Sequence, residues 1–379
     1  MPDSATLIPR ALLEKPGKIL FITHLAIGDY AYLQNFFQAL AAAHPQLELH
    51  IWVDELRRTA DPKKQASLKK YALYDWLAAC PFFKKVYNQT YSPALYKKSI
   101  AEARAQNYGI VISLATLRPH KYARLARQIC PAGFVVGIKK PVTLLTLHRS
   151  LAYKKLDAPI LPGESIKHGL NHVTELYADW FSQLFGLQVP RPARYPHLDI
   201  PAEWKTRATN YLRDWGVNPA ADTLVFINTT AKTKKRCWPM PHAIALIKAM
   251  QQDPRWESAW FLLNTMPADF AATEKTLAAS TLPRTRAYSA SDNFFQLPAM
   301  LAECDLIISV ETAVMHLANA VHVPVIALMR QKNPEWKPID ADRTTVIMPP
   351  ARADWVDKIP VAEVMKAVSK SQAAPCSTP

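Results

Sequence analysis

Short apolar runs that alternate with longer segments of helical spacing constrain the fold of this chain most. One series lies in the N-terminal half, and a second series follows after a break. Runs that are apolar on both faces are typical of parallel strands covered by helices on both sides. The pattern therefore predicts an α/β protein with two Rossmann-like domains, whose parallel sheets face a central cleft. The expected strands are residues 18–23, 47–53, 109–114 and 134–138, then 223–228, 258–264, 305–310, 324–329 and 344–349.

The length of 379 residues fits two domains, because a single hydrophobic core rarely grows that large. Between the two series, the segment LQVPRPARYPHLDIP holds four prolines, which predict an extended linker. We expect an acceptor-side domain over 1–190, a linker over 191–201 and a nucleotide-side domain over 202–350. A C-terminal helix is expected within 351–370, packing back on the first domain, and a disordered tail over 371–379.

The net charge is positive and uneven. Residues 1–190 hold 24 Lys/Arg against 13 Asp/Glu, whereas the remainder holds 22 against 18, which places most of the net charge of +15 in the first half. Such asymmetry points to an anionic partner of the first half: nucleic acid, an acidic membrane face or a negatively charged substrate. A solvated basic surface is the simpler alternative.

Several classes are disfavoured by what the sequence lacks. There is no run of about 18 apolar residues and no basic start followed by an apolar stretch, so we expect a cytoplasmic protein without a membrane span. Five scattered cysteines without a C-x-x-C pair argue against a disulfide framework and a zinc site. Neither G-x-G-x-x-G nor G-x-x-x-x-G-K-[ST] occurs among the nine glycines, so a bound phosphate must be held without a glycine-rich loop.

Open α/β sheets bind ligands at the carboxyl ends of their strands, and three strand ends carry candidate side chains. The first is Asp29, which follows strand 18–23 and starts a helix expected over 30–43. Gly28 is expected to let the backbone turn there. The carboxylate fits either a catalytic acid aimed into the cleft or an ordinary acid in the first turn of a helix.

The second candidate is the loop NTTAKTKKRCWP, residues 228–239, which carries four cations and several hydroxyls. It lies between a strand and a helix that Pro239 or Pro241 is expected to open. Lysine charges, an arginine fork and hydroxyl donors suit a phosphate clamp. The alternative is a solvated basic loop.

The third candidate follows strand 305–310, where Glu311 and Thr312 start a helix with His316 about one turn in. Unpaired N–H groups and a partial positive charge at a helix N-terminus suit a diphosphate. The alternative is a simple helix-start acid and a histidine satisfied in the core.

Together the three stretches resemble glycosyltransferase family 9, the inverting heptosyltransferases of bacterial lipopolysaccharide synthesis. The early G-D turn of that family is matched by Ile27-Gly28-Asp29, and its Thr-rich basic loop ending in Trp-Pro by VFINTTAKTKKRCWP. Its segment D-[ST]-G-x-x-H-L-A is matched by VETAVMHLANAVHVPVIAL, in which Glu311 and Ala313 replace Asp and Gly. KHGLNHVTELYADWFSQLFGL is a weaker match, and MRQKNPEW replaces a Gly-Pro-Thr turn.

The resemblance implies a GT-B fold and inverting, metal-independent transfer of a heptose or related sugar. The implied donor is a nucleotide-diphosphate sugar, ADP-heptose, with no further cofactor, and the implied acceptor is an anionic glycolipid such as the lipopolysaccharide inner core. Asp29 is the implied general base, and a transient contact with the cytoplasmic face of the inner membrane is expected. The implied donor-binding residues are Thr229, Thr230, Lys232, Lys235, Arg236, Glu311, Thr312, Ala313, Val314, Met315 and His316. The acceptor-binding candidates are Gly28, Lys121, Arg124, Lys167, His168 and His172.

Other functions remain open at this stage. A family member could use another donor sugar or a protein acceptor, or have a changed activity because of Glu311. A nucleotide-sugar epimerase can use the same twin-domain architecture without a second substrate. A nucleic-acid-binding protein fits the charge but lacks a recognisable binding signature, and we expect no nucleic acid partner.

Overall fold

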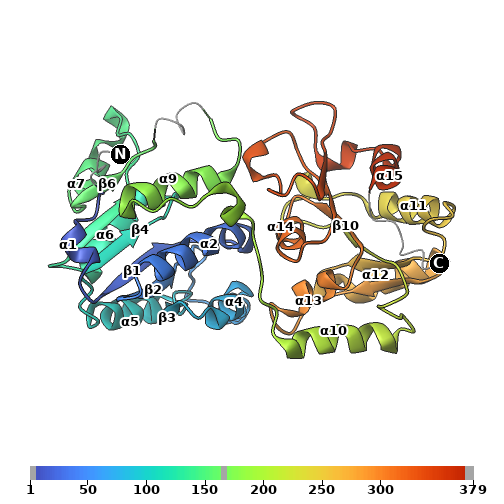
Figure 1. Ribbon diagram of the computed structural model, residues 1–379, viewed down its shortest axis with the longest axis horizontal. Coiled ribbons are helices and arrows are strands. Elements are labelled where there is room, and N and C mark those ends of the chain that lie inside the picture. The colour runs from blue at the N-terminus through green and yellow to red at the C-terminus, as the bar shows by residue number, and fades with distance from the viewer. Residues whose placement is uncertain (1–5, 164–168, 372–379) are drawn as a thin grey trace. The chain divides into compact units, whose positions relative to one another are not determined.

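The computed structural model describes residues 6–163 and 169–371 of the chain. The chain divides into two compact units, residues 1–194 and 195–379, so the division falls inside the segment 191–201. Each unit holds one six-stranded sheet in which neighbouring strands run parallel (Figure 1). The expected α/β class with parallel sheets is confirmed.

The sheet of the first unit is built from β1 (Gly17–Thr23), β2 (Leu47–Val53), β3 (Phe83–Tyr87), β4 (Ile110–Ser113), β5 (Phe134–Ile138) and β6 (Ala158–Ile160). Its strand order is β3-β2-β1-β4-β5-β6, which reverses between β1 and β4 as in a Rossmann fold. The helices are α1 (Arg10–Leu13), α2 (Ile27–Ala43), α3 (Pro62–Lys69), α4 (Leu73–Ala79), α5 (Pro93–Arg104), α6 (Pro119–Ile129), η1 (Leu144–Arg149), α7 (Ser150–Tyr153), α9 (Val173–Phe185) and η2 (Arg191–Arg194).

Helices bury both faces of this first sheet. On one face, Phe21 of β1 packs against Phe37 of α2 and Phe181 of α9, with ring centroids 4.8 and 6.3 Å away. On the other face, Leu20 and Ile22 belong to a core that α5 and α6 complete. Residues 19–23 of β1 are therefore buried at successive positions, which is why the run Ile19–Ile22 is apolar without interruption.

The second unit repeats the arrangement with β7 (Leu224–Asn228), β8 (Trp260–Asn264), β9 (Thr285–Tyr288), β10 (Leu306–Val310), β11 (Val325–Leu328) and β12 (Thr344–Ile347). Its order is β12-β11-β10-β7-β8-β9, which reverses between β7 and β10. The helices are α10 (Ala202–Asp214), η3 (Lys234–Arg236), α11 (Met240–Gln251), η4 (Pro267–Asp269), α12 (Phe270–Ala279), α13 (Gln296–Ala302), α14 (Ala313–Ala320), η5 (Pro334–Trp336), η6 (Val356–Lys358) and α15 (Val361–Lys370).

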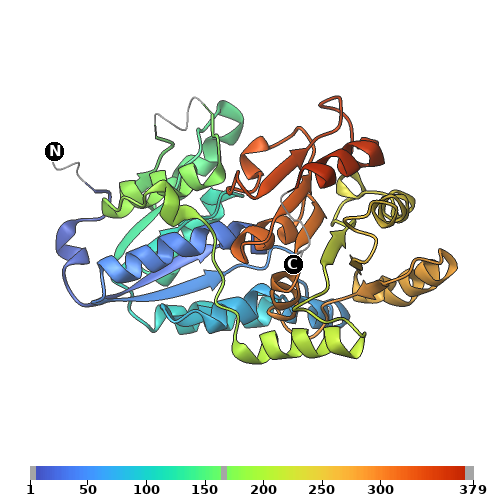
Figure 2. The ribbon, with the colours of Figure 1, turned by 45° about the vertical axis from the view of Figure 1, so that its right-hand side comes forward.

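The expected C-terminal helix is present as α15 and packs within the second unit. The helix α15 lies beside α11, as Figures 1 and 2 show, and Val364 and Val368 are buried in one core with Val225 of β7 and Leu246 of α11. The helix therefore belongs to the core of the second unit, and its packing against the first domain stays a prediction. The apolar side chains of α15 pack on the face of the second sheet that also packs against α11. Residues 372–379, in the expected tail, lie outside the described residues.

The expected strands are present at all nine predicted positions, with ends shifted by no more than two residues. Three strands were not predicted: β3, β6 and β9. All three are edge strands. An edge strand has one neighbour and carries polar residues that discourage further pairing, as in the β3 sequence FKKVY, so its apolar signal is weak.

The proline-rich segment also differs from its prediction. It is not extended throughout, because η2 forms a 3-10 turn within it. The turn is tied to the first unit: the side chain of Asn35 on α2 donates to the carbonyl of Ala193 at 3.2 Å, and Arg194 donates to the carbonyl of Val189 at 2.8 Å. Over the described residues, no helix is both long and apolar enough to cross a bilayer.

Candidate active site

The three strand ends singled out from the sequence lie at the central strands of the two sheets. Asp29 follows β1, the basic loop 228–239 follows β7, and Glu311 follows β10. These strands flank the points at which the strand orders reverse, where open α/β sheets bind ligands. The structure therefore places all three candidate stretches at the sheet edge where ligand binding is predicted.

A side-chain ladder crosses the carboxyl edge of the second sheet. Asn264 at the end of β8 donates to the side-chain oxygen of Asn228 at 2.9 Å. Asn228 at the end of β7 in turn donates to the hydroxyls of Ser309 and Thr312, both at 3.0 Å. Thr312 is the N-cap of α14 and accepts the N–H of Val314 at 3.3 Å. The ladder fixes the start of α14 relative to three strands.

Sequence reasoning missed two members of this ladder, Asn264 and Ser309. The available signal was a polar residue at or near the end of an otherwise apolar strand. Helix α14 itself begins at Ala313, so the predicted strand-to-helix transition after residue 310 is confirmed.

Glu311 lies between two arginines. Its carboxylate is 5% exposed, with Oε1 3.4 Å from Nη2 of Arg236 and Oε2 3.2 Å from Nε of Arg330. Arg330 is 14% exposed and Arg236 is 38% exposed. The pair Arg236 and Glu311 brings the basic loop against the start of α14, as a joint phosphate site requires. Glu311 thus holds Arg236 in place, and Arg330 was not singled out from the sequence.

The basic loop has a fixed backbone. The N–H of Trp238 donates to the carbonyl of Thr229 at 2.9 Å, and the indole N–H donates to the carbonyl of Ile359 at 3.0 Å. Pro239 is the N-cap of α11 and Pro241 lies in its first turn, as predicted. Within this frame the side chains of Lys232 and Lys235 are exposed, and the ammonium of Lys235 lies 5.5 Å over the ring of Trp355.

The remaining donor-side candidates divide by exposure. Thr230, Thr312 and Ala313 are half-buried, whereas five others are buried. The ring of His316 faces Trp336 with centroids 6.2 Å apart. The buried candidates are Thr229, Glu311, Val314, Met315 and His316.

In the first unit, Asp29 lies in the first turn of α2. Its carboxylate accepts the backbone N–H of Ala26 at 2.9 Å and the hydroxyl of Tyr177. Burial raises the pKa of Asp29 to about 6, against the opposing effect of these hydrogen bonds. Helix α2 starts at Ile27 rather than at residue 30, and Gly28 is a residue of its first turn. The expectation that Gly28 lets the backbone turn ahead of the helix is therefore wrong.

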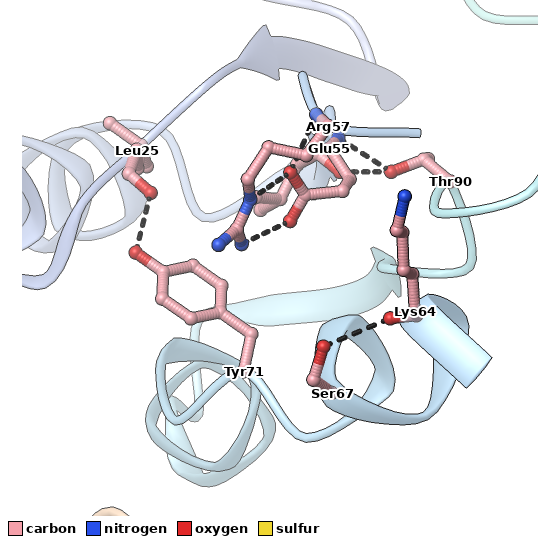
Figure 3. A network of polar contacts seen from close by, with 8 residues as sticks. Leu25, Glu55, Arg57, Lys64, Ser67, Tyr71 and Thr90 are labelled. Atoms are coloured by element: carbon pink, nitrogen blue, oxygen red, sulfur yellow. Dashed lines mark hydrogen bonds and ion pairs between the residues drawn. The ribbon is translucent and has the colours of Figure 1, made fainter. Parts of the chain in front are cut away.

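A half-buried phenol, Tyr71, lies close to Asp29. Its hydroxyl donates to the carbonyl of Leu25, at 3.0 Å, in the loop between β1 and α2 (Figure 3). Burial, with the nearby charge of Asp29 as the next cause, raises the pKa of Tyr71, so the phenol stays protonated at neutral pH. Desolvation, and not hydrogen bonding, is therefore what raises the pKa of the Asp29 carboxyl.

A second group at the edge of the first sheet was also missed. Glu55 accepts two hydrogen bonds from the guanidinium of Arg57, at 2.8 and 2.7 Å, while its backbone N–H donates to the hydroxyl of Thr90 at 2.8 Å (Figure 3). Arg57 is 56% exposed. An exposed guanidinium with a fixed orientation is suited to binding an anion. The signal was the charged run DELRR directly after the strand 47–53.

Asp54, the first residue of the same run, contacts basic and aromatic side chains. It is ion-paired with Arg58 and accepts the hydroxyl of Tyr122 at 2.7 Å. The guanidinium of Arg58 lies 3.5 Å over the ring of Tyr96. Burial lowers the pKa of His24, and the charge of Asp54 opposes that shift.

The predicted acceptor contacts are scattered. Lys121 and Arg124 are exposed on α6. His172 is buried as the N-cap of α9, where its ring accepts the N–H of Thr174 at 3.1 Å and packs edge-on against Tyr32. Lys167 and His168 lie outside the described residues. The structure thus describes three of these predicted acceptor contacts, Lys121, Arg124 and His172.

Two Rossmann-type units with parallel sheets define the GT-B class of glycosyltransferase fold, and solved structures support this. The chain aligns with the glycosyl transferase family 9 protein from Veillonella parvula at a TM-score of 0.71 and 16% identity, covering 94% of this chain and 97% of that one. With the E. coli ADP-heptose lps heptosyltransferase II, the TM-score is 0.66 and the identity 18%, and the alignment covers 93% of this chain and 97% of that one. With the E. coli heptosyltransferase WaaC with ADP, the TM-score is 0.62 and the identity 16%, with coverage of 93% of this chain and 97% of that one.

The sequence pattern of glycosyltransferase family 9 (heptosyltransferase) matches residues 104–355. The chain belongs to this family, and it is a glycosyltransferase of the heptosyltransferase type. The search of curated proteins found no match.

Proposed function

We propose that the protein transfers a heptose or related sugar from ADP-heptose to a hydroxyl of an anionic acceptor such as the lipopolysaccharide inner core, with inversion at the anomeric carbon. One observation carries the proposal: a carboxyl group with a pKa raised to about 6 follows the central strand of the first sheet. The family supports the reaction class. The donor is inferred from neighbours that are described as an ADP-heptose enzyme and as an enzyme with ADP.

In the proposed reaction Asp29 takes the proton of the acceptor hydroxyl while that oxygen bonds to the anomeric carbon. The bond between this carbon and the diphosphate oxygen breaks on the opposite side, and its electron pair leaves with the nucleotide. A pKa near 6 suits this role, because the carboxylate is ionised at neutral pH yet more basic than an ordinary aspartate.

The charge that develops on the diphosphate is stabilised by the second unit. Arg236 is oriented by Glu311, and Lys232 and Lys235 add mobile positive charge. Backbone N–H groups from Ala313 to Met315, at the start of α14, and a hydrogen bond from His316 complete the proposed site. No metal is required in this scheme. We place the enzyme in the cytoplasm with transient contact to the inner membrane, where exposed Lys121 and Arg124 meet the anionic acceptor.

The pH dependence of the reaction tests the base. Since Asp29 must be ionised, we expect kcat/KM to fall about tenfold per pH unit below its pKa of about 6. Burial raises the pH at which kcat/KM begins to fall above the pH expected for an exposed aspartate. The fall should therefore be measurable in ordinary buffers. A rate profile that stays level well below pH 6 would exclude Asp29 as the base.

A panel of nucleotide sugars tests the donor. A ligand that binds only the folded state at about 100 times its Kd adds about 2.7 kcal/mol, which raises the Tm of a domain of this size by roughly 5 to 10 °C. We expect this shift with ADP-heptose in the presence of EDTA, and a smaller one with UDP-sugars. A preference for a UDP-sugar, or isomerisation of the donor without acceptor, would contradict the proposal and favour an epimerase.

A further inference from the structure

Four leucines on one surface segment of the first unit are exposed. Leu144, Leu145 and Leu147 on η1 and Leu151 on α7 are 91%, 93%, 63% and 65% exposed; we call them the leucine patch. Large apolar side chains gathered in this way on a protein surface usually mark a binding surface. Exposure above nine tenths means that the first two stand clear of the protein.

The local structure holds the patch outward. Helix α7 contacts α6 and buries Ala152 and Tyr153, so its inner side is already occupied. Ahead of it, the N–H of Thr143 donates to the hydroxyl of Thr146 at 2.8 Å, and this bond closes the first turn of η1. Leu144, Leu145 and Leu147 therefore project from a hydrogen-bonded turn, and Leu151 projects from α7.

Positive charge surrounds the patch. The sequence from residue 103 to residue 156 contains ten Lys/Arg and no Asp or Glu, and one of the ten, Arg127, is ion-paired with Asp157 just beyond this segment. Lys139 and Lys140 precede η1, Lys154 and Lys155 follow α7, and all four are exposed. The helix α6, which lies beside α7 (Figure 1), adds the exposed Lys121 and Arg124.

We propose that the leucine patch is a membrane-docking site: its leucines enter the head-group region of an anionic phospholipid bilayer and the flanking lysines bind lipid phosphates. Projecting apolar side chains with lysines on both sides fit a lipid interface, because the head-group region can take up single side chains without a matching pocket. A protein partner would have to offer both pockets for the leucines and acids for the lysines. The inference rests on exposure and charge alone, and not on the proposed reaction.

Binding of the full chain to vesicles tests the site in the absence of donor and acceptor. We expect binding to phosphatidylcholine vesicles that contain an equal amount of phosphatidylglycerol, and weak binding to phosphatidylcholine alone. Leu144→Ser with Leu145→Ser should lower the partition coefficient at least about tenfold, because burial of leucine side chains contributes to docking. Lys154→Glu with Lys155→Glu should lower it by at least about tenfold on anionic vesicles only.

Matched controls separate docking from general effects. Leu12→Ser alters another exposed leucine of the first unit, and Lys248→Glu with Lys275→Glu makes the same charge change on the second unit. Both should leave vesicle binding unchanged. If the leucine variant does not fold, as judged by circular dichroism, the lysine variant and its control decide.

Three results would overturn the proposal: no binding of the unaltered chain to anionic vesicles, equal binding by the patch variants, or equal losses in the controls. A change in sedimentation from dimer to monomer, without a change in vesicle binding, would also overturn it and assign the patch to self-association. Because no sugar transfer is measured, failure here leaves the proposed reaction intact. Loss of transfer with a soluble acceptor would likewise leave the docking site intact.

Discussion

Asp29→Asn should reduce kcat by at least about 100-fold while leaving donor binding intact. The amide can accept the N–H of Ala26 as the carboxylate does, so helix α2 keeps its start, but it cannot take up a proton. Loss of a general base typically lowers rates by about 100- to 10,000-fold. Single-turnover rates with saturating donor and acceptor measure the effect.

The same substitution should raise stability at neutral pH. An acid whose pKa is raised on folding contributes stability below its unfolded value and loses it as the pH rises through its folded value of about 6. Ionised Asp29 therefore costs about 2 to 3 kcal/mol at neutral pH, so Asn should raise the Tm of the first unit by roughly 5 °C or more. The gain should vanish as the pH falls toward about 4.

Asp61→Asn provides the matched control. Asp61 is the N-cap of α3 in the same unit, with its side chain 41% exposed, and asparagine is an equivalent cap. It should change neither turnover nor the pH dependence of Tm. Full turnover by Asp29→Asn would refute the mechanism, whereas loss of turnover without a gain in stability would show that burial does not set the pKa of Asp29.

Arg236→Ala should lower kcat by about 100-fold, the usual effect of removing one well-placed donor to a developing negative charge. The fold should survive, since the buried Glu311 keeps its contact with Arg330. Arg236→Lys should recover only part of the rate, because a lysine lacks the planar fork that can contact both Glu311 and a phosphate.

Lys234→Ala is the control for this loop. Lys234 is exposed in the same turn, η3, and its replacement by alanine removes one positive charge from the loop, as Arg236→Ala does. If charge alone attracts the diphosphate, both alanine variants will raise KM alike. If orientation by Glu311 matters, only Arg236→Ala will lower kcat. Equal kinetics in the two variants would therefore contradict the assigned role of Arg236.

Glu311 stands where the family pattern has Asp, and the structure gives a physical interpretation of this difference. The family resemblance suggested a carboxylate that contacts the donor sugar, yet both carboxylate oxygens here lie against arginines. The longer side chain spans the distance between Arg236 and Arg330. Its donor-binding role stays a prediction, and the contacts present assign it to positioning Arg236.

The central strands were predictable because burial on two faces leaves an unbroken apolar run, as in β1 and β10. The residues after them were predictable because a parallel sheet directs its strand ends to one edge. Edge strands such as β9, sequence TRAY, carry no such run. Arg330, Asn264 and Tyr71 were missed because their roles depend on partners 19, 36 and 46 residues away along the chain.

By itself, the sequence determined the two parallel sheets, the strand ends that carry the candidate site residues and the family. Those properties follow from local periodicity and short motifs. Only the tertiary structure decided that burial makes Asp29 a stronger base, that Glu311 serves two arginines and that α15 belongs to the core of the second unit. Each of these depends on which distant side chains share a desolvated space, and desolvation is a property of the folded chain.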